Sequence, residues 1–263
     1  MKNLTKALLA APVALTLIAA PAAFAATTTT TTTGLTQPDN LPDGKDVIER
    51  GIEAIGGKRA YRKLENIRQT GRLETAGISG SLKIVANDDD NVRVTIDIPG
   101  FDQVITGVSG GVAYRTSITQ GAQVLEGKEA ESQIEEADFF RAINPWDFIE
   151  SAETVAAEDV DGEKCYKVRL ELDNGDEQTR WYSAETGLLR KSQSIVPQAG
   201  QMINTTTVTS DYREVEGVLF PHRLDLSAGG LPPQSLIMDK IEANVDLDSD
   251  ALALPDDVQA LVK

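Results

Sequence analysis

The residues best suited to nucleophilic chemistry are a single cysteine, Cys165, and a single histidine, His222. A thiolate beside an imidazole can act as a nucleophile, but only if the two side chains meet in space. Cys165 lies within residues 164–168, a run typical of a strand, where a free cysteine is usually buried. We therefore expect a structural thiol at Cys165 and a surface or rim histidine at His222.

Acidic side chains offer a second chemistry, the binding of a cation. Asp246, Asp248 and Asp250 have the 1-3-5 spacing of a calcium-binding loop, and Asp257 falls at position 12. Ala251, however, stands at position 6, where such loops require glycine. The sequence also contains no motif of a serine hydrolase, a zinc protease or a nucleotide-binding loop. We therefore expect no metal, no cofactor and no catalytic residues, and the hypothesis of an enzyme is the weakest of three.

The first 25 residues have the pattern of a secretory signal peptide. Lys2 and Lys6 give a short positive start before an uncharged apolar stretch, residues 8–20, and Ala23-Phe24-Ala25 is a small-x-small cleavage site. The stretch is shorter than the roughly 20 apolar residues that span a bilayer. We expect cleavage after about Ala25, export to the periplasm as a soluble protein, and no transmembrane segment after cleavage.

Composition limits the partners of the exported chain. The full sequence has a formal net charge of −16 and is more acidic still without Lys2 and Lys6, which repels nucleic-acid phosphates, so we expect no nucleic-acid partner. Residues 26–43 are rich in threonine and too poor in apolar side chains to offset the entropy of ordering, which predicts a disordered linker. Residues 44–263 then form the folded part, which we interpret as a single domain and expect to be a monomer.

Periodicity divides this folded part into one helix followed by strands. Apolar residues at helical spacing predict a helix that begins near Gly44, is capped by Asp43 and ends at Gly56-Gly57. From Gln69 the apolar period changes to two, and Asn174-Gly175 is a strong hairpin turn. About ten strands follow, joined mostly by tight turns, so neighbours should pair antiparallel. This pattern predicts a mainly β (α+β) fold, a long curved antiparallel sheet with an N-terminal helix.

One segment, residues 127–151, interrupts the strand pattern. Ser132 and Glu135 have the spacing of a capping box, which predicts a short helix that Asn144-Pro145 ends. A segment this aromatic must bury its side chains, either around a small ligand or in a dry core, and periodicity leaves both open. We select its large aromatic residues as candidate ligand-facing or lid residues: Phe139, Phe140, Trp146 and Phe148.

Four passages, taken in order, resemble a known family. They are Ile55-Gly56-Gly57-Lys58 leading to Gly71, residues 160–168 leading to 181–189, residues 211–221, and residues 241–255. Their turns and strand starts resemble those of the periplasmic outer-membrane lipoprotein carrier and sorting (LolA/LolB-like) superfamily. The resemblance implies an unclosed antiparallel β-barrel, with helices as a lid over its concave apolar face. It also implies binding of lipid or lipoprotein acyl chains.

We therefore expect a periplasmic binding or carrier protein for an apolar ligand, which is a lipid, an acyl chain or a lipoprotein. The alternative is an envelope protein-interaction or sensor module without bound lipid, whose sheet docks a partner protein. The interior beneath residues 127–151 distinguishes the two hypotheses, because only a carrier needs a cavity there.

Overall fold

The computed structural model describes residues 41–198 and 201–262, so the predicted signal peptide and most of the predicted linker lie outside the described residues. Among the described residues, the helix α2 (Gly44–Ala54) comes first and is followed by α3 (Gly57–Tyr61). The Asp43 carboxylate accepts a hydrogen bond from the Lys45 N–H at 2.8 Å, so the predicted cap is confirmed. Gly56 and Gly57 both have positive φ, which allows the chain to turn at the predicted end of α2.

Strands make up most of the rest, and the prediction of a mainly β fold is confirmed. In the described part of the chain, thirteen strands, compared with about ten predicted, pair antiparallel in one sheet of order β6-β5-β4-β3-β2-β1-β13-β12-β11-β10-β9-β8-β7. Their bounds are β1 (Asn66–Thr75), β2 (Ile78–Asn87), β3 (Val92–Asp97), β4 (Val104–Ser109), β5 (Val112–Ser117), β6 (Gly121–Val124), β7 (Ile149–Val160), β8 (Glu163–Leu172), β9 (Glu177–Ser183), β10 (Leu189–Gln198), β11 (Gln201–Val215), β12 (Val218–Ala228) and β13 (Gln234–Ala243).

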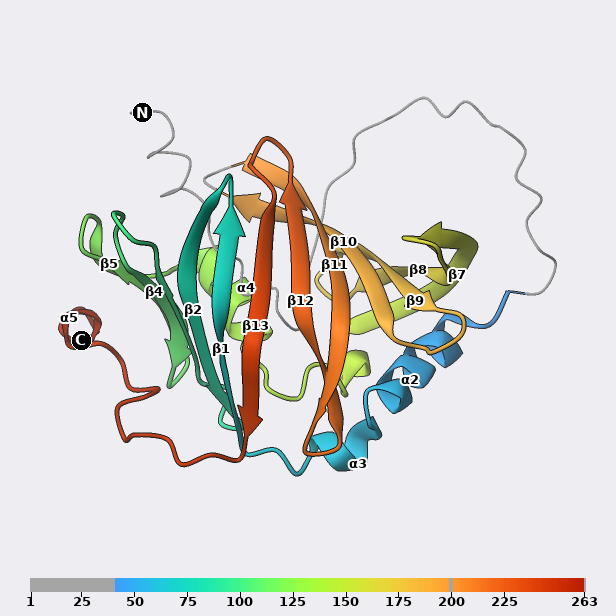
Figure 1. Ribbon diagram of the computed structural model, residues 1–263, viewed down its shortest axis with the longest axis horizontal. Coiled ribbons are helices and arrows are strands. Elements are labelled where there is room, and N and C mark those ends of the chain that lie inside the picture. The colour runs from blue at the N-terminus through green and yellow to red at the C-terminus, as the bar shows by residue number, and fades with distance from the viewer. Residues whose placement is uncertain (1–40, 199–200, 263) are drawn as a thin grey trace.

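The sheet curves without closing into a barrel, because β6 and β7 form its two edges and do not pair with each other. Figure 1 shows β1, β13 and β12 upright at the centre, while β7, β8 and β9 lie to their right and are inclined to them. The helix α4 (Gly127–Glu136) lies inside the curve and packs on β4 and β5, and α2 lies along the side near β7 to β9. The concave face therefore encloses the core.

A bulge between β1 and β13 determines which side chains of β13 face that core. Thr70 pairs with Lys240 and Gly71 pairs with Met238, so Asp239 is an extra residue on β13. The insertion shifts the alternation, so that Met238 and Ile241 are both buried although they are three residues apart. A Cβ on Gly71 would lie 2.0 Å from the Ile237 carbonyl oxygen, so this close approach requires glycine.

Two expectations about local structure are wrong. The helix α4 begins at Gly127, five residues before the predicted cap at Ser132, which lies inside the helix. It ends at Glu136, eight residues before the predicted stop at Asn144-Pro145, where a separate 3-10 turn begins instead. Its first turn has no side-chain cap, and so the start of α4 left no capping signal in the sequence. His222 is also not a rim residue, since its side chain is 4 % exposed and its Nδ1 lies 3.1 Å from the Phe220 carbonyl oxygen.

Cys165 is a structural thiol, as expected. It is fully buried in a small cluster with Val160 and Trp181, and burial raises the pKa of its thiol to about 11. The short helix α5 (Asp256–Gln259) lies near the C-terminal end of the described residues and packs beside β5 and β6. Across the described ranges, no helix combines the length and apolar character required to cross a bilayer.

Candidate ligand-binding site

A partly enclosed cavity of about 160 Å³ lies between α2 and the concave face of the sheet. An apolar protein cavity of about 150 Å³ is enough for a molecule the size of benzene. The space therefore admits the end of an acyl chain as the structure stands, and it is smaller than the roughly 300 Å³ at which typical ligand pockets begin. A longer chain requires α2 or the segment before β7 to move outward.

The helical wall of the cavity is apolar. Ile48, Ile52 and Ile55 project from α2 at helical spacing, and all three line the cavity. Gly51, on the same helix, lets α2 approach β9 closely, because a Cβ there would lie 2.8 Å from the Tyr182 ring. The central strands complete this apolar surface with Leu219, Phe220, Leu224 and Ile241.

The opposite wall is polar and crosses three strands in a row. Arg180 on β9 pairs in register with Ser192 on β10, which pairs in turn with Thr207 on β11. All three residues line the cavity. Side chains directly opposite each other on neighbouring strands share a face of the sheet, so this row brings one guanidinium and two hydroxyl groups together. We refer to these three residues as the polar row.

Tyr212 and Thr209 extend the polar side of the cavity beyond the polar row. The Tyr212 hydroxyl donates to the Leu189 carbonyl oxygen at 2.7 Å, and Thr209 Oγ1 donates to the same oxygen at 2.5 Å. Burial raises the pKa of Tyr212 to about 12, so its hydroxyl stays protonated at neutral pH. Both groups are held by the backbone of β10 and so give this part of the wall a fixed geometry.

Arg180 is the charged group of this wall. Its side chain is 9 % exposed, its Nε donates to Gln178 Oε1 at 2.6 Å, and Nη1 lies 3.5 Å from the Tyr182 hydroxyl. Nη2 is buried and has no hydrogen-bond acceptor within the described ranges. The described carboxylates also include none within ion-pair distance of Arg180. The motif search of the sequence did not select this residue.

A second guanidinium, that of Arg141, is also buried near this wall. It stacks 3.6 Å above the Phe148 ring, and its Nη2 lies 4.0 Å from the Glu135 carboxylate. Burial lowers the pKa of Arg141, and repulsion from the Arg180 charge contributes to the same shift. Burial raises the pKa of the neighbouring Glu136 to about 8, so most of that carboxyl is uncharged at neutral pH. The interior therefore carries more positive than negative charge.

The four aromatic residues selected from the sequence lie between α4 and the first residue of β7. The cavity lining, as far as the structure describes it, comprises none of the four, although Ala142 and Pro145 of the same segment take part. Phe139 and Phe140 pack edge-on against each other and against Tyr61, which does line the cavity. The structure thus brings this pair together beneath α3. That the four face a ligand or act as a lid stays a prediction.

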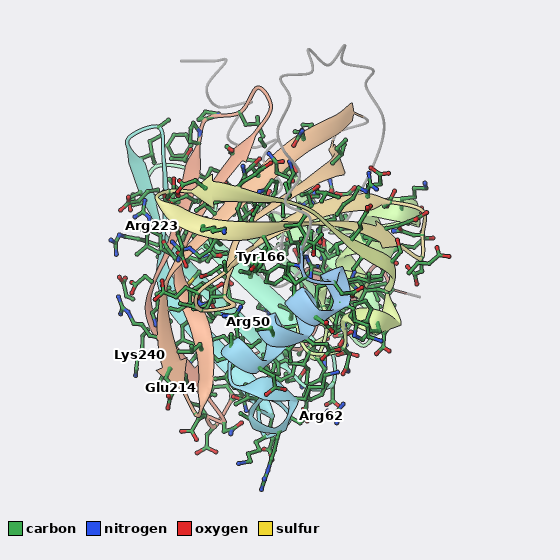
Figure 2. All side chains as sticks on the ribbon, turned by 90° about the vertical axis from the view of Figure 1, so that its right-hand side faces the viewer. Arg50, Arg62, Tyr166, Glu214, Arg223 and Lys240 are labelled. Carbon is green, nitrogen blue, oxygen red and sulfur yellow. The ribbon has the colours of Figure 1, made fainter. Side chains whose placement is uncertain are left out.

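Trp146 and Arg50 attach α2 to its surroundings. The indole Nε1 of Trp146 donates to the Glu49 carboxylate at 2.5 Å. Arg50, labelled on α2 in Figure 2, donates to the carbonyl oxygens of Ala184 and Glu185 at 3.0 and 2.6 Å. These bonds connect α2 to η1 (Pro145–Asp147) on one side and to the β9–β10 turn on the other. A few polar contacts thus hold the apolar helix over the cavity.

Comparison with known proteins gives matches in structure and none in sequence. No protein-family model and no curated protein matches the chain. A DUF1329 family protein from Desulfovibrio piger has a TM-score of 0.55 at 10 % identity, with 81 % of this chain and 98 % of that one covered. A LolA superfamily protein from Nitrosomonas europaea has a TM-score of 0.50 at 14 % identity, with 81 % and 98 % covered. The chain has the LolA/LolB-like fold.

A domain from Vibrio parahaemolyticus, described as a candidate outer-membrane lipoprotein-sorting domain, is similar to the same extent. Its TM-score is 0.50 at 10 % identity, with 78 % of this chain and 97 % of that one covered. The sequence resemblance to the superfamily is therefore confirmed at the level of fold. At identities of 10 to 14 %, these similarities show the fold of this chain but do not identify its individual site residues.

Proposed function

We propose that the protein is an exported, periplasmic binding or carrier protein for an amphiphile with an acyl chain, such as a lipid or the lipid part of a lipoprotein. The observation that supports this most directly is the partly enclosed cavity between the apolar face of α2 and the concave sheet. Its lining offers apolar contacts, hydroxyl groups and one guanidinium, and these groups are suited to binding a ligand. The LolA superfamily and lipoprotein-sorting structures that share the fold support the same class.

The energy for binding comes from the acyl chain. Each buried CH₂ group contributes about 0.8 kcal/mol, and the present cavity holds only the end of a chain. We propose that α2 and the segment with Phe139, Phe140, Trp146 and Phe148 form a lid that moves outward as a longer chain enters. The contacts of Arg50 and Trp146 are the ones that such a movement has to break.

The first experiment is native mass spectrometry of the full chain purified from a periplasmic extract, together with titration by the fluorescent fatty acid cis-parinaric acid. We expect a co-purifying lipid mass or saturable binding of the probe. Ile52→Trp should fill the cavity and weaken probe binding about tenfold or more, because Ile52 lines it. Ile118→Trp is the matched control, since Ile118 is 88 % exposed.

One observation favours the alternative, an envelope protein-interaction module, and this is the small size of the cavity. If no lipid co-purifies and the fatty acid does not bind to the wild-type protein, the carrier proposal is wrong. Capture of a protein partner on the concave face would then identify the module, and Ile52→Trp should not affect that capture if the partner stays outside the cavity.

A further inference from the structure

We propose that Arg180 anchors the anionic head group of the ligand, so that the natural ligand is an anionic amphiphile with a carboxylate or phosphate beside its acyl chain. This inference rests on the proposed function, because it specifies the charge of the head group of the same ligand and places that head group at Arg180. It is based on the polar row and on the distribution of charge around it.

The first argument is that the Arg180 guanidinium is buried but incompletely paired. Nη2 has no acceptor in the described part of the chain, and the other two nitrogens have only neutral partners, Gln178 and Tyr182. A buried charge is normally paired, because its desolvation is costly. A planar guanidinium presents two parallel N–H groups that match a carboxylate or phosphate. Because Nη2 is itself fully buried, the guanidinium has to turn toward the cavity that Arg180 lines. An anion there would then complete a site that is otherwise unsatisfied.

The second argument is that the rest of the polar row can bind the same anion. The hydroxyls of Ser192 and Thr207 lie next to Arg180 in register and line the cavity. Neither hydroxyl has a hydrogen-bond partner among the described residues. A hydroxyl can donate to an anion oxygen that the guanidinium does not reach. One cation and two free hydroxyls, held on adjacent strands, form a compact set of donors.

The third argument concerns the surrounding field. Arg141 lies close enough to Arg180 for the two charges to repel, and its nearest carboxylate, Glu135, is 4.0 Å away. The interior is thus locally positive, in a chain whose net charge is −16. Because the medium inside is poorly polarisable, a negative group there would gain from both guanidinium groups. A cationic head group would be repelled by both, and a neutral one would gain at most a hydrogen bond without the attraction between opposite charges.

The fourth argument is the polarity of the cavity as a whole. The polar row lies on β9 to β11, and Ile48, Ile52 and Ile55 line the helical wall. A ligand with its anionic end at Arg180 and its chain along α2 would satisfy both walls at once. A purely apolar ligand would cover the guanidinium and leave it unpaired, at a cost in affinity.

The test is a competition assay with the full exported chain. The uncharged dye N-phenyl-1-naphthylamine reports on the cavity and is displaced by hexadecanol, by palmitate or by palmitoyl lysophosphatidic acid. We expect at least one of the two anions to bind about tenfold or more tightly than the alcohol, since hydrogen bonds to a charged group are the stronger ones. Whether palmitate or the lysophospholipid binds more tightly identifies the head group as a carboxylate or a phosphate.

Variants then assign that preference to Arg180. In Arg180→Met the ratio of anion to alcohol affinity should fall to about one, while the dye and hexadecanol still bind. Arg180→Lys should keep an intermediate ratio, because the charge stays but the planar fork is lost. Arg213→Met is the matched control, since Arg213 is a 55 % exposed arginine whose loss should leave the ratio unchanged. If Arg180→Met shows no cooperative thermal transition, Arg180→Gln replaces it.

The outcomes separate the two proposals. Equal affinity of the wild-type protein for all three ligands, or an unchanged ratio in the Arg180→Met or Arg180→Gln variant, overturns the anchor but leaves the carrier function standing. No binding of the dye, the alcohol or either anion overturns both. A wild-type preference for an anion that disappears with the Arg180 charge supports the anchor.

Discussion

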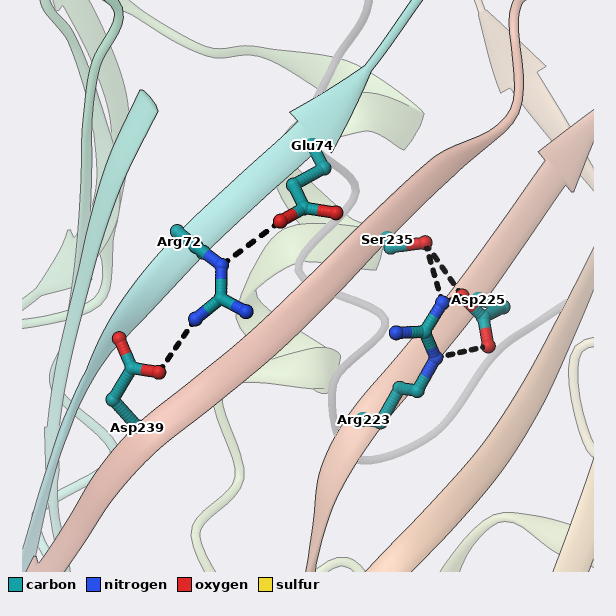
Figure 3. A network of polar contacts seen from close by, with 6 residues as sticks. All are labelled: Arg72, Glu74, Arg223, Asp225, Ser235 and Asp239. Carbon is teal, nitrogen blue, oxygen red and sulfur yellow. Dashed lines mark hydrogen bonds and ion pairs between the residues drawn. The ribbon is translucent and has the colours of Figure 1, made fainter. Parts of the chain in front are cut away.

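Arginine side chains on the two faces of the sheet differ in whether they contact a carboxylate. On the outer face of the central strands, Arg72 contacts the carboxylates of Glu74 and Asp239 at 2.9 and 2.6 Å, and Arg223 contacts Asp225 at 2.7 Å (Figure 3). On the concave face, Arg180 lies in the cavity wall with no carboxylate partner in the described chain. These two exposed arginines are thus paired with carboxylates, whereas the buried arginine is not.

This difference separates structural from functional charge. Alternate residues of a strand share a face, so Arg72 and Glu74, like Arg223 and Asp225, are paired by spacing alone. Such exposed pairs stabilise a protein little. Arg180 instead has Gln178 and Tyr182 at the same two-residue spacing, and neither can neutralise it. An unneutralised charge in the interior is a cost to the fold that a ligand can remove.

Buried and exposed carboxyl groups should also differ, in how they make the free energy of unfolding depend on pH. Glu136 should show the largest effect of this kind. Burial raises its pKa from the ordinary 4.5 to about 8, despite the nearby Arg141. The folded state therefore holds a proton that the unfolded state releases, so the free energy of unfolding should fall as pH rises between about 5 and 8. The slope from this one group approaches about 1.4 kcal/mol per pH unit.

The measurement is urea unfolding of the wild-type protein and Glu136→Gln from pH 5 to pH 8. Glutamine cannot ionise, so the free energy of unfolding of the variant should rise by several kcal/mol relative to that of the wild type across this range. Glu131→Gln, an exposed position of the same helix, is the control and should show no such gain. Parallel curves for the wild type and Glu136→Gln would mean that Glu136 is hydrated and ionised in the folded state.

The second prediction concerns the bulge between β1 and β13, which determines the side chains of β13 that face the core. Gly71→Ala places a Cβ 2.0 Å from the Ile237 carbonyl oxygen, so β1 or β13 has to shift. We expect a loss of about 3 kcal/mol in the free energy of unfolding, at the upper end of overpacking effects. Gly229→Ala is the matched control, because nothing lies within 4 Å of the added Cβ. Equal stability of the two variants would show that the bulge adapts without cost.

Much of the fold could be predicted from local sequence signals. The cap at Asp43, the glycine pair that ends α2 and the Asn174-Gly175 turn each work over a few residues, and the Gly175 N–H does donate to the Leu172 carbonyl oxygen at 2.9 Å. The strand β6, with only four residues, is too short for its alternation to be recognised. The start of α4 was missed because Glu126 makes no side-chain cap.

The site was harder to predict than the fold, because its residues come from strands far apart in the sequence. The apolar face of α2 was visible as periodicity, and it does line the cavity. The polar row becomes visible only once the register of β9, β10 and β11 is known. Two signals existed in the sequence. Arg180 lacks the acidic residue two positions away that accompanies Arg72 and Arg223, and His222 alternates with the buried Phe220 and Leu224.

The third prediction concerns the cost of Arg180 to the unliganded fold. Arg180→Met should raise the free energy of unfolding by about 1 to 2 kcal/mol, because replacing a poorly compensated buried charge by an apolar side chain of similar length is often stabilising. Thermal and urea unfolding of lipid-free protein measure this change. A loss of stability instead would show that the bonds to Gln178 and Tyr182 outweigh the desolvation of the guanidinium.

The smallest effect is expected on the outer face, at Arg223 and Asp225. Burial alone would raise the pKa of Asp225, but hydrogen bonds from Arg223 and Ser235 bring it below the ordinary value. The stability from this pair is therefore present above the ordinary pKa and is lost as pH falls through the lowered one, the opposite sign to Glu136. A double-mutant cycle with Arg223→Met and Asp225→Asn at pH 7 should give a coupling below about 1 kcal/mol, since both side chains are over a third exposed. A coupling several times larger would mean that the outer face stores stability in its ion pairs, and an unpaired arginine would then no longer distinguish the concave face as the functional one.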